Sequence, residues 1–181
     1  MLVKKRRKSI KFFRLWKSWV FPIITVILIE NYDPGDNNLL LGLYSSILED
    51  KNRLVLPDEF KEEYKDGIYI TRGFDRNIMA LTLSAFESIY ERVMSLNLAD
   101  PVVRLLLRMV LGNACRAEIT PDLKIEISDI LKEAADLERE IVLVGQGDFI
   151  EIWSPENWDM QEEKLVNVEA NQFAALNIAS R

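Results

Sequence analysis

An internal repeat constrains the fold more than any other feature, because the pattern of residues 42–86 returns in residues 115–158. In both stretches a charged turn leads into a short apolar run, then a helical pattern, then two strand-like runs. Residues 69–73 match residues 141–145, residues 78–81 match residues 150–153, and Phe86 falls where Trp158 does. Each copy of a repeat this long is expected to be one supersecondary unit. The sequence therefore predicts a tandem duplication.

The first copy opens on a charged turn that leads into a short strand. Asp50 and Asn52 suit a turn, and asparagine is among the few non-glycine residues that tolerate a left-handed backbone. An apolar run of strand length follows and ends at Pro57. Lys51 and Arg53 lie two residues apart, so on an extended backbone they project to the same side. This pattern predicts a small cationic prong on a tight turn, although such charges are more often simply solvated.

Periodicity and capping signals predict the other elements. Strands are expected at residues 39–46, 68–72 and 78–83, and a short helix at 58–64. Helices are expected to start at Ser84, where Glu87 completes a capping box, and at Asp100-Pro101. The predicted fold class is α+β, with these segments: an extension (1–38), repeat 1 (42–86), linking helices (87–114), repeat 2 (115–158) and a tail (159–181).

The residue types present exclude several kinds of site. The chain has no histidine and a single cysteine, Cys115, so it can form neither an internal disulfide nor a zinc site of Cys and His ligands. The usual general base near neutral pH is also missing. Glu49 and Asp50 are adjacent and need not face each other as a catalytic pair. An enzyme is thus the weakest interpretation, no cofactor is expected, and Cys115 is expected to be buried.

Charge is distributed unevenly along the chain. The net charge is −6, but residues 1–38 hold eight Lys or Arg against three acidic residues. The body that follows is therefore strongly acidic and would not attract nucleic acid through its overall charge. Binding to DNA would need small basic sites, and an oligomer that presents several of these weak sites at once would raise the affinity.

Residues 1–38 differ from the rest and admit three interpretations. A basic cluster precedes an apolar run at residues 19–29, which is short for a transmembrane helix and lacks a following small-residue cleavage site. The segment could be an upstream extension created by a misplaced start codon, a basic membrane-surface or signal-anchor segment, or an integral part of the fold.

Several motifs together resemble the MraZ family of bacterial transcriptional regulators. The matching stretches are residues 49–57 with their tandem copy, residues 108–114, residues 141–146 and residues 151–153. The resemblance covers residues 39–161 and implies two swapped-hairpin (AbrB-type) repeats in a ring-shaped homo-oligomer. It also implies a cytoplasmic, nucleoid-associated protein that binds double-stranded DNA at direct repeats in the promoter of the division and cell-wall gene cluster. Family members start near Leu39, which favours the misplaced start codon.

The resemblance includes the family's DNA-contact motif, Asp-x-Lys-Gly-Arg, which has a counterpart in each copy of the repeat. In the first copy Glu49 replaces the Asp, Lys51 and Arg53 are kept, and Asn52 replaces the Gly. In the second copy only Lys124 remains as a cation, at the position of the Arg, and Leu123 stands where the Gly is expected. The resemblance thus implies DNA contacts by Lys51, Asn52, Arg53 and Lys124.

The acidic residues of the first turn are assigned a supporting role. The Glu49 carboxylate would hold Arg53 in place, and Asp50 would help to shape the turn. Arg53 could contact guanine O6 and N7 bidentately, while Lys51 would neutralise a phosphate.

Two other functions stay open from the sequence. Erosion of the second motif would also fit an oligomeric scaffold that has lost DNA binding. A membrane-tethered regulator that uses the basic amino terminus is the other alternative.

Overall fold

The computed structural model describes residues 4–5 and 39–167, so the expectations for the rest of the amino-terminal segment and for residues 168–181 lie outside it. Its strands are β1 (Lys4–Lys5), β2 (Leu40–Glu49), β3 (Arg53–Val55), β4 (Ile68–Arg72), β5 (Ile78–Thr82), β6 (Cys115–Ala117), β7 (Lys124–Glu126), β8 (Glu140–Gly147) and β9 (Phe149–Trp153). Its α-helices are α2 (Leu83–Met94), α3 (Pro101–Val110), α4 (Asp129–Ala134) and α5 (Pro155–Asn167), and its 3₁₀ helices are η2 (Asp50–Asn52) and η3 (Asp58–Phe60). The predicted α+β class is confirmed. The duplication and the ring stay predictions.

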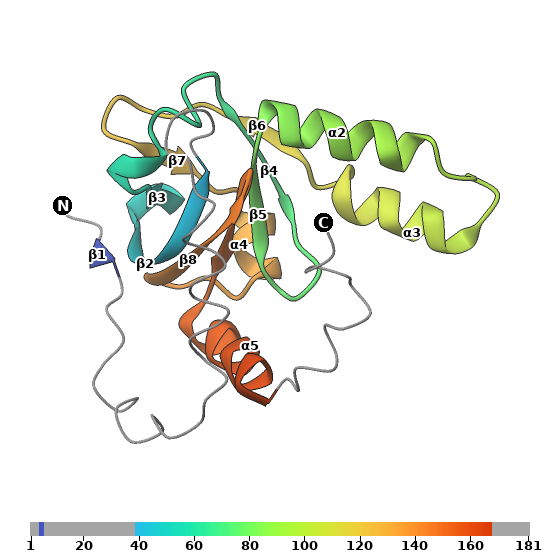
Figure 1. Ribbon diagram of the computed structural model, residues 1–181. Coiled ribbons are helices and arrows are strands. Elements are labelled where there is room, and N and C mark those ends of the chain that lie inside the picture. Colours follow the sequence, from blue (N-terminus) through green and yellow to red (C-terminus); the bar gives the residue numbers. More distant parts are fainter. Residues whose placement is uncertain (1–3, 6–38, 168–181) are drawn as a thin grey trace, which may run out of the picture.

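The strands form one antiparallel sheet that curls into a nearly closed barrel (Figure 1). Their order is β6-β4-β5-β9-β8-β2-β3-β7, and β1 pairs with β2. The ladders β2–β8, β3–β7, β4–β6 and β5–β9 each join a strand from residues 39–112 to one from residues 115–167. The two halves of the described chain are therefore interlocked rather than stacked side by side.

The main core fills the inside of this sheet, and two smaller apolar clusters pack Leu81 against α2 and Trp153 against Trp158 of α5. Side chains alternate between its two faces, as the period of an extended strand requires. Tyr64 is buried in this core, and its hydroxyl donates a hydrogen bond to the carbonyl of Ala80 at 2.8 Å. The largest fully buried residues come from both halves: Leu40, Leu54, Ile68, Ile70, Ile78, Leu81, Ile125, Ile127, Leu131, Ile141 and Leu143.

The helix expected at residues 58–64 is instead the short 3₁₀ helix η3 followed by a turn. Its bonds run from residue i to i+3, as from the Phe60 amide to the Pro57 carbonyl at 3.1 Å. The prediction rested on apolar spacing, and that spacing still holds, because Phe60 and Tyr64 are both buried and their rings pack edge to face.

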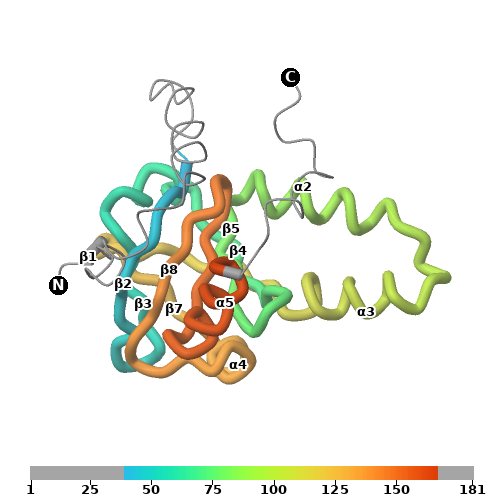
Figure 2. The backbone as a smooth tube through the Cα atoms, turned by 60° about the horizontal axis from the view of Figure 1, so that its bottom comes forward, coloured from blue at the N-terminus to red at the C-terminus, as the bar shows by residue number. Residues whose placement is uncertain are grey.

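Helices α2 and α3 form a hairpin that projects away from the sheet (Figures 1 and 2). Asp100 caps α3 as predicted, accepting a hydrogen bond from the Val102 amide at 2.8 Å. The cap of α2 is Thr82 rather than the predicted Ser84. The base of the hairpin is fixed to the sheet, where the rings of Tyr69 and Phe86 stack 3.9 Å apart. No helix within the described ranges is long and apolar enough to cross a membrane.

Candidate nucleic-acid interface

The turn between β2 and β3 has an unusual backbone. Asn52 has a φ of 52°, so the left-handed conformation predicted from its motif position is confirmed, and Lys51 is left-handed as well, with a φ of 61°. The Asn52 side chain donates a hydrogen bond to Asp129 Oδ1 at 2.6 Å, and its carbonyl accepts one from the Ile127 amide at 2.9 Å. These bonds tie the turn to the other half of the chain and leave Lys51 exposed at its tip.

Valine at position 52 should strain this turn. A β-branched residue is a severe steric outlier at positive φ, so we expect Asn52→Val to lower the free energy of unfolding by about 1–2 kcal/mol. Asn52→Gly keeps the left-handed conformation accessible and serves as the matched control for loss of the side-chain hydrogen bond. Urea unfolding followed by circular dichroism measures both variants. Equal losses in the two would show that backbone strain is not the cause.

Arg53 is the first residue of β3 and is only loosely held. Its side chain is 48% exposed, and its Nη2 lies 3.9 Å from Glu49 Oε2. Its Nε donates a long hydrogen bond of 3.4 Å to the carbonyl of Asp50. Across the ladder, Arg53 stands opposite Glu126. The guanidinium is thus oriented by the turn and still has donors that face solvent.

The second turn shares with the first the left-handed residue at the glycine position of the motif, but Asp122, at the position of Lys51, is not left-handed. Leu123 takes the place expected for glycine and has a φ of 56°. Thr120 stands where the motif has its Asp. Its hydroxyl accepts a hydrogen bond from the Lys124 amide at 3.0 Å and donates one to Asp122 Oδ1 at 2.6 Å. This network stabilises the turn without a glycine.

The β3–β7 ladder brings the predicted site residues of both turns together. Lys124 Nζ lies 3.1 Å from Glu49 Oε2 and 2.7 Å from Asp122 Oδ2, and its side chain is only 20% exposed. Glu49 thus contacts the cations of both turns, Arg53 and Lys124. Lys51 stands apart from this cluster, and no ion pair to it is found among the described residues.

Hydrogen bonds shift the pKa values of both members of the second-turn ion pair. The bond from Lys124, followed by that from Thr120, lowers the pKa of Asp122 from 3.8 to about 2. The bonds to Asp122 and then to Glu49 raise the pKa of Lys124. Both groups are therefore charged throughout the physiological range.

The Asp122 titration gives a direct check of this ion pair. Because its pKa is lowered on folding, the interaction is fully present above pH 3.8 and is lost as the pH falls through about 2. We expect Lys124→Gln to raise the Asp122 pKa toward 3.8, as measured by NMR of the side-chain carboxyl carbon. An unchanged pKa in that variant would contradict the assigned cause.

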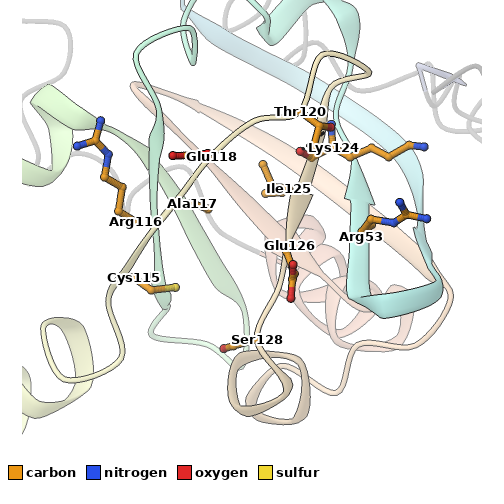
Figure 3. Close-up of a pocket in the computed structure, with 10 residues that line it drawn as sticks. All are labelled: Arg53, Cys115, Arg116, Ala117, Glu118, Thr120, Lys124, Ile125, Glu126 and Ser128. Atoms are coloured by element: carbon orange, nitrogen blue, oxygen red, sulfur yellow. Dashed lines mark hydrogen bonds between the residues drawn. The ribbon is translucent and has the colours of Figure 1, made fainter.

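An open groove of about 450 Å³ lies beside the turns (Figure 3). Arg53 and Lys124 line one side of it, and Cys115 and Arg116 of β6 line the other. The expectation that Cys115 is buried was wrong, because β6 is an edge strand of the sheet. Arg116 was not predicted as a site residue from the sequence, because it lies outside the motif. Its Nη2 donates a hydrogen bond to the Asp66 carbonyl at 3.2 Å.

Comparison with known proteins gives consistent matches. A family model of the MraZ protein, described as antitoxin-like, matches residues 117–177. The chain is 36% identical over 127 residues to the transcriptional regulator MraZ of Thermomicrobium roseum, covering 70% of this chain and 89% of that protein. It is 39% identical over 123 residues to the protein of that name in Clavibacter michiganensis subsp. michiganensis, covering 67% and 85%. It is 33% identical over 120 residues to the protein of that name in Leuconostoc mesenteroides subsp. mesenteroides, and the match covers 66% of this chain and 84% of that protein.

Proposed function

Because this chain belongs to the MraZ family, we propose that it is a transcriptional regulator that acts by binding double-stranded DNA. The names of its relatives support a regulator rather than an enzyme. The observation that carries the proposal is the turn between β2 and β3, where Lys51 is exposed and Arg53 keeps 48% of its side chain exposed. Both cations sit on a turn that is anchored to the other half of the fold.

In this proposal the first turn makes the main DNA contacts. Arg53 donates two hydrogen bonds to O6 and N7 of a guanine in the major groove, and Lys51 neutralises a neighbouring phosphate. Asn52 sets the left-handed backbone that separates the two side chains. Two contacts orient the guanidinium: the Glu49 carboxylate lies 3.9 Å from Nη2, and the Asp50 carbonyl accepts the 3.4 Å hydrogen bond from Nε.

One such turn is a weak binder, so the proposal includes a ring-shaped homo-oligomer. The α2–α3 hairpin carries exposed apolar side chains: Tyr90, Met94, Leu96, Leu98, Val102 and Leu105. Exposed apolar residues also lie elsewhere, at Phe74 and Ile130. The apolar surface of the hairpin supports a head-to-tail contact, in which the hairpin of one copy packs on the next and a ring closes. Such a ring presents several turns to direct repeats in DNA.

The targets proposed for this ring are direct repeats in the promoter of the division and cell-wall gene cluster, with the protein in the cytoplasm on the nucleoid. These follow from the family resemblance. They are tested by footprinting the protein on that promoter region in its own genome, where protection of evenly spaced repeats is expected.

Charged residues on α3 should prevent assembly. Val102 and Leu105 are 70% and 63% exposed, so a Val102→Asp/Leu105→Glu variant should fold normally yet remain monomeric. Light scattering after size-exclusion chromatography measures the mass, and circular dichroism checks the fold. A Leu165→Glu variant, changed at an exposed position on α5, is the matched control. An unchanged mass in the α3 variant would remove the hairpin from the interface.

A gel-shift titration of the full chain tests DNA binding itself. The probe is the DNA upstream of its own gene, with an unrelated fragment of equal length as competitor, at several salt concentrations. A discrete, salt-sensitive shift on the specific probe is expected. Assembly without any shift at low salt would favour the scaffold alternative.

A further inference from the structure

The Glu49 carboxylate is shared unequally between two cations. Its Oε2 atom lies 3.1 Å from Lys124 Nζ and 3.9 Å from Arg53 Nη2. The first distance is that of a charge-assisted hydrogen bond, whereas the second is at the outer limit of an ion pair. Glu49 is therefore bound by Lys124 and only weakly engaged with Arg53.

The side chain of Lys124 is itself poorly placed to contact a phosphate. It is 20% exposed, compared with 48% for Arg53, and its ammonium group already contacts two carboxylates, those of Asp122 and Glu49. Asp122 occupies the position in the second turn that Lys51 occupies in the first. In the second turn, Asp122 is therefore a counter-ion for Lys124. In the first turn, the same position holds the exposed Lys51.

We propose that Lys124 is a positioning residue, whose ammonium group binds the Glu49 carboxylate and so keeps the Arg53 guanidinium available for DNA. This inference rests on the DNA-binding function proposed above. It gives Lys124 a role different from the direct DNA contact that the motif predicted. The interaction crosses the β3–β7 ladder. A lysine in the second half of the chain thus controls how available the arginine of the first turn is for DNA.

The consequence of losing Lys124 follows from the chemistry of the remaining groups. Without the ammonium group, Arg53 is the remaining ion-pair partner of the Glu49 carboxylate among the described residues. A carboxylate and a guanidinium favour a bidentate pair, which would occupy the donors that a guanine needs. Arg53 would still be present but would be less available for binding.

A double-mutant cycle on the full chain separates positioning from direct contact. The variants are Lys124→Gln, Glu49→Gln and the double variant, with Lys65→Gln as a control at an exposed lysine distant from the turn in sequence. We expect Lys124→Gln to weaken binding to the upstream DNA about three- to tenfold, and to have little further effect when Glu49 is already glutamine. The salt dependence of binding should keep its slope. Equal losses in both backgrounds, with a slope reduced by about 0.9, would show a phosphate contact and overturn the proposal.

A second measurement needs no DNA. Phenylglyoxal modifies accessible arginines, and mass spectrometry reports the rate at Arg53. We expect the rate at Arg53 to fall several-fold in Lys124→Gln and to recover in the double variant. The rate at Arg72, which is exposed and distant from the turn in sequence, should not change. If the wild-type chain fails to bind DNA, the proposed function fails, and this rate still decides the role of Lys124. An unchanged rate at Arg53 would contradict it.

Discussion

Arg53→Ala is expected to weaken binding to the specific DNA probe by about five- to 150-fold, the range of 1–3 kcal/mol for one bidentate arginine–guanine contact. The larger value applies if several copies in an oligomer each lose the contact. The fold should be unaffected, because the side chain is 48% exposed and its polar contacts among the described residues are long, at 3.4 Å and 3.9 Å. Gel-shift titration at fixed salt measures the change.

Arg72→Ala is the matched control for this experiment, since Arg72 is an exposed arginine at the end of β4. The control should bind the specific probe as the wild type does. Discrimination between the specific probe and the unrelated fragment should also fall in Arg53→Ala, because a base contact carries sequence information and a phosphate contact does not. Full affinity and discrimination in Arg53→Ala would remove this turn from the recognition surface.

Leu143→Ala is expected to lower the free energy of unfolding by about 2–5 kcal/mol, which is the range for a leucine truncated in a packed core. Leu143 is fully buried and lies on β8, between Tyr44 of β2 and Ile152 of β9. Because the ladders join the two halves of the chain, this loss should affect both halves at once. Urea unfolding should show one cooperative transition, shifted to lower urea.

Leu165→Ala provides the comparison, since this leucine is 59% exposed on α5 and should change stability by no more than about 0.5 kcal/mol. All variants need the same protein concentration, because assembly contributes to apparent stability. Two separate transitions, with only one shifted by Leu143→Ala, would mean that the halves unfold independently. That result would contradict the interlocked sheet.

Several features of the site could be predicted because they depend on local chemistry. The left-handed backbone at Asn52 followed from the small set of residues that tolerate positive φ. The Asp100 cap of α3 followed from the Asp-Pro pair. The α+β class followed from strand-like and helix-like periods along the chain. Each of these signals lies within a few residues of the feature that it predicts.

Other features could not be predicted, because they join residues far apart in the chain. Nothing near Glu49 indicates that its carboxylate binds Lys124, since the contact exists only where β3 pairs with β7. The Asn52–Asp129 hydrogen bond has the same origin. Cys115 was expected to be buried because of its apolar neighbours, but its place on the edge strand β6 exposes it.

The sequence alone therefore determined the turn, its cations and the family to which its motifs point, because these are properties of short stretches. The tertiary structure decided which charges are free to act. The interlocked ladders place the Lys124 ammonium group 3.1 Å from Glu49 and 2.7 Å from Asp122, while Lys51 and Arg53 keep their exposure. A side chain's charge is fixed by its type, but its availability depends on the partners that folding brings within hydrogen-bonding distance.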